Sequence, residues 1–163
     1  MSRATQGVTL VTGGNRGIGL AITQTILEEG GEVVCVSRQA PELQHERLHS
    51  VIVDLGDREE TKQAVGEINA NHQVLNIVHN AGVIRPAQIE DVALTDLDYL
   101  TELHLATMVT LVQASLPAMK DAGYGRIVGI SSRGALGLQT RTNYAATKAG
   151  MFGMRRTWAL ELG

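Results

Sequence analysis

TGGNRGIG, at Thr12–Gly19, is the stretch that decides the fold of this chain. It follows an apolar, β-branched run at residues 8–11 and precedes a segment whose apolar residues recur at helical spacing. In a strand-turn-helix unit of this kind, Gly13 allows a tight turn, Gly17 allows close approach to the backbone, and Gly19 lets helix and strand pack. The helix N-terminus then offers free N–H groups and a positive dipole end to a pyrophosphate. The stretch therefore predicts a dinucleotide-binding turn, and a merely structural glycine-rich turn is the alternative.

Short β-branched runs alternate with longer helical periodicities along the rest of the chain. This alternation is typical of repeated βα units, which form a parallel sheet. We expect an α/β, doubly wound, Rossmann-like fold with about five parallel strands in the order 3-2-1-4-5 and helices on both faces. The expected strands are residues 8–11, 33–36, 51–53, about 74–78, and 127–130.

Three of the expected helices have recognisable features. Asp57 and Glu60 form a plausible capping box for the helix after the third strand. Thr95 is a candidate N-cap of a long helical region that extends to about residue 122, and Pro117 should kink or divide this region near its end. A last helix is expected at about residues 143–162.

The composition is that of an ordinary globular protein. The chain has 163 residues, which is room for a single dinucleotide-binding domain over residues 1–163. With 44% hydrophobic and 19% charged residues, it is too apolar to be disordered. No apolar run approaches the length of about 18 residues that a membrane span needs. The net charge of −3 gives no sign of nucleic-acid binding.

The cysteine and histidine content argues against a disulfide or a metal site. The single cysteine, Cys35, excludes an intrachain disulfide and a cysteine-based zinc cluster. We expect a cytoplasmic protein, because a reducing compartment is the default for such a chain. No pair has metal-ligand spacing among the scattered histidines His45, His49, His72 and His79.

The chain stops at Gly163, directly after the last helix. A second βαβαβ half needs a sixth strand, without which the fifth strand is an exposed sheet edge. We therefore expect this sequence to be part of a larger working protein. A natural five-strand domain, as in flavodoxin-like folds, is the alternative.

The end of the second strand bears on the choice of cofactor. An acidic residue normally holds the ribose 2′-hydroxyl of NAD there, but Glu32 and Glu42 are poorly placed for that role. The strand ends instead in Ser37-Arg38, and both Arg38 and Arg16 can attract a 2′-phosphate. We therefore expect NADP rather than NAD, unless both arginines are solvated surface groups.

We expect a reactive group of side chains where the fifth strand ends and the last helix begins. Tyr144 and Lys148 are four positions apart and therefore share one helix face. An ammonium stabilises a nearby phenolate, which allows a tyrosine to exchange a proton with an alcohol or carbonyl oxygen. Ser131 and Ser132 end a strand at the carboxyl edge of the sheet, where a hydroxyl can hold the reacting oxygen. The alternative is an ordinary surface pair of helix residues.

In these motifs the sequence resembles the short-chain dehydrogenases/reductases of the TGxxxGxG type. The turn is followed in order by Asp54-Leu55, Asn80-Ala81-Gly82, and an ISS segment with YAATK between Ile130 and Lys148. The resemblance covers essentially the whole chain. It implies a nicotinamide cofactor and a small carbonyl or alcohol as substrate.

The resemblance also implies a role for each matching residue. Tyr144 would be the general acid/base, and Lys148 would support it and hold the nicotinamide ribose. Ser132 matches the family's serine by its place in the strand-end motif, and we expect it to be the catalytic serine. Ser131 is the alternative, because it lies thirteen positions before Tyr144, which is the family's usual spacing. With the turn and the two arginines already argued, the predicted cofactor-binding residues are Gly13, Asn15, Arg16, Gly17, Ile18, Gly19, Arg38, Asp54, Leu55, Asn80, Ala81, Gly82, Tyr144 and Lys148.

Two departures from the family pattern stand out. His104 occupies the position where the family usually has an asparagine that holds a water in a proton relay, and it is either a substitute for it or a plain helix residue. Family members also continue past the point that corresponds to Gly163, with further strands and a substrate-covering loop. The resemblance further implies a homo-oligomer built on the last two long helices.

Two functions remain open from the sequence. The first is an NADP-dependent oxidoreductase that transfers hydride between nicotinamide and a carbonyl or alcohol. The second is a catalytically incomplete module that binds nucleotide without turnover.

Overall fold

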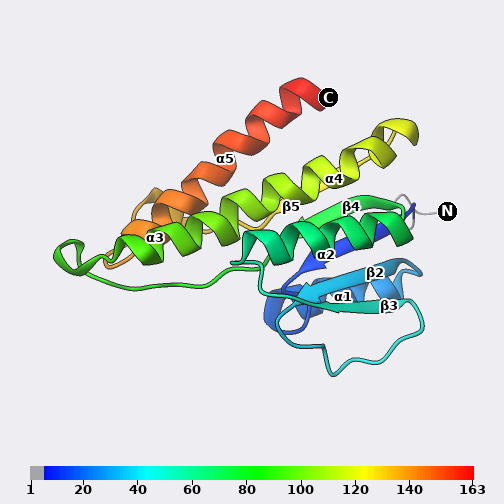
Figure 1. Cartoon of the computed structure of the whole chain (residues 1–163), viewed down its shortest axis with the longest axis horizontal. Coiled ribbons are helices and arrows are strands. Elements are labelled where there is room, and N and C mark those ends of the chain that lie inside the picture. Colours follow the sequence, from blue (N-terminus) through cyan, green and yellow to red (C-terminus); the bar gives the residue numbers. More distant parts are fainter. Residues whose placement is uncertain (1–5) are drawn as a thin grey trace.

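A parallel sheet with the strand order β3-β2-β1-β4-β5 organises the chain, as the sequence predicted. The computed structural model describes residues 6–163. The strands are β1 (Val8–Thr12), β2 (Glu32–Ser37), β3 (Leu48–Ile52), β4 (Val74–His79) and β5 (Arg126–Gly129). The helices are α1 (Gly17–Glu28), α2 (Arg58–Asn71), α3 (Leu94–Thr101), α4 (Thr107–Asp121) and α5 (Thr142–Leu162), with short segments η2 (Ile89–Asp91), η3 (Glu102–Ala106) and η4 (Arg133–Leu136) (Figure 1).

The three central strands are buried on both faces of the sheet. Every described residue of β1 and β4 is buried, and β2 is buried from its second residue onward. Strands covered on both sides are continuously apolar rather than alternating, which is why they were recognisable in the sequence. The edge strands β3 and β5 are partly exposed.

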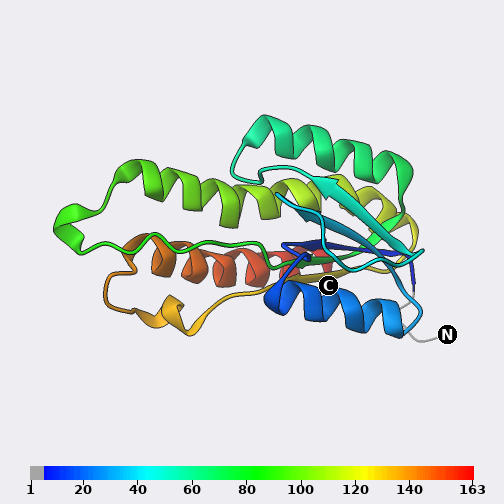
Figure 2. The ribbon, with the colours of Figure 1, turned by 90° about the horizontal axis from the view of Figure 1, so that it is seen from below.

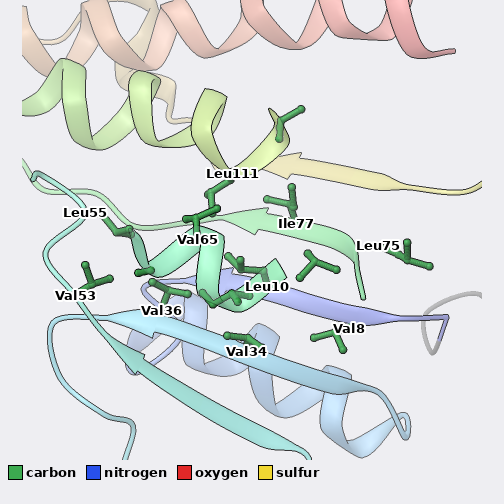
Figure 3. Packing of buried hydrophobic residues seen from close by; sticks show 14 of the residues in the cluster. Val8, Leu10, Val34, Val36, Val53, Leu55, Val65, Leu75, Ile77 and Leu111 are labelled. Carbon is green, nitrogen blue, oxygen red and sulfur yellow. The ribbon is translucent and has the colours of Figure 1, made fainter. Parts of the chain in front are cut away.

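Helices cover both faces of the sheet, with α1 on one side and α2 on the other (Figure 2). Leu10, Val36 and Ile77 come from three adjacent strands and share one apolar cluster with Val65 of α2 and Leu111 of α4 (Figure 3). On the opposite face, residues of α1 pack against a smaller cluster around Val11, Val33 and Val78. The helix α5 contacts α3 and η3.

Several element boundaries differ from the sequence expectation. The third strand begins at Leu48, because it pairs in register with β2 from Val33 onward and its edge position tolerates polar residues. The long helical region starts at Leu94 with Ala93 as N-cap, so Thr95 is not the cap. Asp57 caps α2 as predicted, and its carboxylate accepts hydrogen bonds from two backbone N–H groups at 2.9 and 3.0 Å. The Asp57 N–H donates to the Asp54 carbonyl oxygen at 3.0 Å and not to Glu60, so the predicted capping box is only half formed.

The long helical region is interrupted by a turn of π-helix at η3, which the sequence did not reveal. Pro117 does not divide it, because α4 continues through this residue to Asp121. Single π-helical turns inside longer helices are frequent at functional sites. None of the helices within residues 6–163 is long and apolar enough to cross a membrane.

Candidate active site

The predicted phosphate-binding turn joins β1 to α1. Gly13 and Gly17 have φ angles of +65° and +55°, a region that side chains other than glycine rarely adopt. A Cβ atom at Gly19 would collide with the carbonyl oxygen of Gly13, so the helix can only pack this closely on glycine. Neither a side-chain cap nor an acidic first-turn residue occupies the start of α1 in the described chain. The first N–H groups of α1 are therefore available to an anion.

The end of β4 holds this turn in place. The Asn80 side-chain amide donates to the carbonyl oxygens of Thr12 and Gly13 at 3.1 and 3.2 Å. The backbone N–H groups of Asn80 and Ala81 donate to the Thr12 hydroxyl at 3.0 and 2.9 Å. Thr12 was not predicted as a functional residue, although it opens the motif that decided the fold.

A cavity of about 720 Å³ opens beside this junction, at the carboxyl edge of the sheet. Most predicted cofactor-binding residues line it, namely Gly13, Asn15, Arg16, Gly17, Ile18, Arg38, Asp54, Leu55, Asn80, Ala81 and Gly82. Gly19 instead lies behind the turn, and Tyr144 and Lys148 lie next to the cavity rather than in its lining. Arg16 and Arg38 are both exposed, so both guanidinium groups are accessible to a ligand.

Tyr99 is a cavity residue that sequence reasoning missed. Its hydroxyl donates to the Asp54 carboxylate at 3.2 Å, and the Gly56 N–H donates to the same oxygen at 2.9 Å. Burial and the Asp54 carboxylate raise the pKa of Tyr99. A Cβ at Gly56 would collide with the Tyr99 ring, so only glycine allows this close contact. No local pattern in the sequence indicates it. Asp54 is thus held in a fixed orientation at the cavity wall.

Lys148 is buried beside Tyr144 in the first turns of α5. Its side chain is 3% exposed, and Nζ donates to the carbonyl oxygen of Ile130 at 2.8 Å. The same Nζ lies 5.7 Å from the centroid of the Tyr144 ring. Burial lowers the pKa of Lys148 to about 8, so the ammonium is still mostly protonated at neutral pH. The predicted pair is therefore brought together, with a positive charge next to the phenol ring.

The two candidate serines have different roles in the structure. The Ser131 hydroxyl donates to the backbone carbonyl oxygen of Lys148 at 2.9 Å and so fastens α5 to the end of β5. The Ser132 hydroxyl accepts a hydrogen bond from the Gly134 N–H at 3.0 Å, which leaves its own proton available. A Cβ at Gly134 would lie 3.4 Å from both Ser132 Oγ and a ring carbon of Tyr144. Ser132 Oγ and the Tyr144 ring therefore both border the position of Gly134.

His104 faces the same region from the π-helical segment η3. Its Nδ1 lies 2.8 Å from the Thr147 hydroxyl, which itself lies 3.1 Å from two backbone carbonyl oxygens of α5. Since that hydroxyl can donate to a carbonyl, it accepts from Nδ1, and His104 Nε2 is left as an acceptor. Within the described chain this Nε2 is buried without a hydrogen-bond partner.

Gly82 lies close to both His104 and Lys148. A Cβ at this position would lie 3.0 Å from His104 Nε2 and 3.5 Å from Lys148 Nζ. The His104 and Tyr144 rings also meet edge to face, with 5.7 Å between their centroids. Gly82 and the side chains of His104, Tyr144 and Lys148 therefore border one small volume beside the nucleotide cavity.

Burial keeps the two histidines near this volume neutral. Burial and the charge of Lys148 lower the pKa of His79 to about 4 and that of His104 to about 3. His79 Nδ1 also lies 3.0 Å from the Thr12 hydroxyl, so His79 belongs to the junction of β1 and β4. Sequence reasoning treated His79 as a scattered histidine because the partner is 67 positions away in the chain.

The family model described as short chain dehydrogenase matches residues 7–163, so the chain belongs to the short-chain dehydrogenase family. The chain is 32% identical to the 3-oxoacyl-[acyl-carrier-protein] reductase FabG of Thermotoga maritima, over 95% of this chain and 68% of that protein. It is 33% identical to the acetoacetyl-CoA reductase of Synechocystis sp., over 94% of this chain and 65% of that protein.

A solved structure agrees with the fold. The blue fluorescent protein from a metagenomic library, in complex with NADPH, superposes with a TM-score of 0.88 at 28% identity, over 99% of this chain and 71% of that one. The chain thus spans about two thirds of the length of the proteins it matches.

The buried histidines predict a pH dependence of stability. In the unfolded chain both have a pKa of about 6.5, so between about pH 6.5 and 4 the unfolded state binds more protons than the folded state. The free energy of unfolding should therefore fall as the pH falls, by up to about 1.4 kcal/mol per pH unit for each histidine. His104→Asn should reduce this slope in urea unfolding series between pH 7 and 4.5.

The exposed His45 provides the control for this measurement. His45→Gln should keep the pH slope of the unmodified protein. Equal slopes for His104→Asn and the unmodified protein contradict a neutral, buried His104.

Proposed function

We propose that this chain is a single dinucleotide-binding domain of an NADP(H)-dependent oxidoreductase. The reaction transfers hydride between nicotinamide and a carbonyl or alcohol, with Tyr144 as general acid/base. The observation that carries the proposal is the buried Lys148 ammonium, which Ile130 holds beside the Tyr144 ring and next to the nucleotide cavity. A positive charge costs free energy in a buried position, so its presence at this place calls for a functional reason.

The residues present fit the cofactor. A Cβ at Gly13 would lie 3.0 Å from the Asn80 amide nitrogen and 3.1 Å from the Ala81 Cα. Only a glycine at this position therefore leaves the turn accessible to a pyrophosphate. The free N–H groups at the start of α1 would bind the pyrophosphate, and Arg16 and Arg38 would bind a 2′-phosphate. The NADPH complex of the blue fluorescent protein supports NADP over NAD. When bound, the nicotinamide supplies the hydride.

The side chains of this chain position the substrate oxygen and move a proton. In the direction of reduction, Ser132 donates a hydrogen bond to the carbonyl oxygen, and Tyr144 gives its phenolic proton to that oxygen as the alcohol forms. The Lys148 ammonium stabilises the phenolate that remains on Tyr144. His104 Nε2, which is buried close to Gly82 and Lys148, would accept a hydrogen bond in a proton relay, at the position of the family's asparagine.

The named relatives suggest which carbonyl to test first. One is named for reducing a 3-oxoacyl thioester on acyl-carrier protein, and the other for reducing acetoacetyl-CoA. We therefore propose a 3-oxoacyl thioester as substrate, with acetoacetyl-CoA as its soluble representative. The homo-oligomer through α4 and α5 and the cytoplasmic location stay predictions.

Nucleotide binding without turnover is the second candidate. The residues that line the 720 Å³ cavity come from the part of the chain between Gly13 and Leu103, so binding there does not require Tyr144. Turnover is the property that separates the two functions, because both predict nucleotide affinity.

Tyr144→Phe tests the proposed function. The variant keeps the ring but loses the phenolic proton, so kcat with acetoacetyl-CoA and NADPH should fall at least about 100-fold. The dissociation constant for NADPH, measured by fluorescence titration, should stay within about twofold because the cavity is lined by other residues. Tyr124→Phe, at a phenol bound to Asn76 away from the site, should keep its activity. Retained turnover in Tyr144→Phe contradicts the assignment.

Ser132→Ala and Ser131→Ala distinguish the two serines. Loss of the hydrogen bond to the reacting oxygen should lower kcat/KM of Ser132→Ala by about 100-fold. Ser131→Ala loses a bond to the α5 backbone and should lower the free energy of unfolding by about 1 kcal/mol, with a smaller effect on kcat/KM. The reverse ranking of the two kcat/KM values assigns the catalytic role to Ser131 instead.

Arg38→Leu tests the 2′-phosphate contact. Removal of a charge-assisted hydrogen bond should weaken NADPH binding about 10-fold to 100-fold and leave NADH binding nearly unchanged. The exposed Arg126, on the edge strand β5, is the control, and Arg126→Leu should change neither affinity. An equal loss for NADPH and NADH places Arg38 away from the 2′-phosphate.

A further inference from the structure

A group of potential metal ligands lies at the amino edge of the sheet, opposite the nucleotide cavity. Glu32 Oε1 lies 2.8 Å from His49 Nε2 and 3.7 Å from His72 Nδ1. One ligand atom from each of the three residues lies within 4.8 Å of the other two. All three side chains are partly exposed, so an ion can reach them from solvent.

The fold brings these residues together from three elements. Val34 of β2 pairs with His49 of β3, and Glu32 lies two residues before Val34, so both side chains project from the same face of the sheet (Figure 3 labels Val34). Ala64, Val65 and Ile68 of α2 pack on that face in the cluster of Val34. His72, the C-cap of α2, therefore ends beside Glu32.

We propose that Glu32, His49 and His72 bind one divalent transition-metal ion, with Zn²⁺ as the best match. Imidazole and carboxylate are zinc ligands, and two histidines with one glutamate are a known set of three. Tetrahedral zinc with bonds of about 2.0–2.2 Å places ligand atoms about 3.3 Å apart, so the two distances from Glu32 Oε1, 2.8 and 3.7 Å, are close to this value. All three ligand atoms lie within 4.8 Å of one another, so binding would draw the two histidine nitrogens closer together. The fourth position would be filled by water.

The surroundings favour a cation. His72 stands at the C-terminus of α2, where the unpaired carbonyl groups and the negative end of the helix dipole attract positive charge. The His49 and His72 rings also lie with their centroids 4.8 Å apart around one carboxylate. A hydrogen bond from His49 to Glu32 accounts for two of the three residues, whereas a bound ion accounts for the convergence of all three.

The site would link β2, β3 and α2 at the end of the sheet that does not carry the reaction. Sequence spacing alone could not indicate it, because His49 is 17 positions from Glu32 and His72 belongs to another element. The proposal does not depend on the proposed oxidoreductase function.

Zinc titration of the tag-free, chelator-treated protein tests the site. Isothermal titration calorimetry with ZnCl₂ should give one saturable equivalent, and His49→Ala and His72→Ala should each weaken binding at least about tenfold. His45→Ala, which removes an exposed histidine of the β2–β3 connection, should bind zinc like the unmodified protein. Glu32→Gln is the mildest change and should also weaken binding.

Far-UV circular dichroism before the titration establishes that each variant is folded. Cobalt substitution adds an independent readout, because visible absorption of bound Co²⁺ reports its ligand geometry and should be lost in His49→Ala. The proposal is overturned if the unmodified protein shows no saturable equivalent of zinc. It is equally overturned if folded His49→Ala, His72→Ala and Glu32→Gln bind zinc as tightly as His45→Ala.

Discussion

The hydrogen bonds between Thr12 and Asn80 are the constraint on which the rest of the site depends. They join the end of β1 to the end of β4, where the two halves of the sheet meet, and open α/β sheets bind ligands at such a point. Through Thr12 and Gly13 the junction fixes the phosphate-binding turn. Through His79 it reaches the buried surroundings of Lys148. One set of short contacts therefore positions both the nucleotide cavity and the reactive group.

Of the three basic side chains near Tyr144, only Lys148 carries a positive charge near neutral pH. Three basic side chains, His79, His104 and Lys148, lie close together in a buried volume, where mutual repulsion and desolvation oppose a second charge. Lys148 keeps its proton near neutral pH because its ordinary pKa is far higher than that of an imidazole. The two neutral histidines can then act as hydrogen-bonding groups, and the phenol ring of Tyr144 lies beside a single cation.

The sequence predicted the features that depend on local pattern. The strand order followed from apolar runs and from the turn at Thr12–Gly19. Around the cavity, Arg16 and Arg38 were predicted from their places at strand ends, whereas Asp54, Leu55 and residues 80–82 were predicted from the family resemblance. The interruption at Glu102–Ala106 was invisible, because a π-helical turn has no distinct composition and is stabilised by its packing. The contact of Tyr99 with Asp54 was missed for a related reason. It joins residues 45 positions apart, and no periodicity reports such a pair.

The amino and carboxyl ends of the sheet's strands are mechanically separate, although β2 connects them. Glu32 begins this strand and Ser37 ends it beside Arg38, so β2 is the path by which a displacement at one end would reach the other. The residues between them, Val33–Val36, are fully buried and paired with β1 on one side and β3 on the other. A close-packed strand with both ladders formed has little freedom to shift along its axis. Loss of the Glu32 carboxylate should therefore leave Arg38 in place, so the proposed metal site and the proposed nucleotide site can be tested independently of each other.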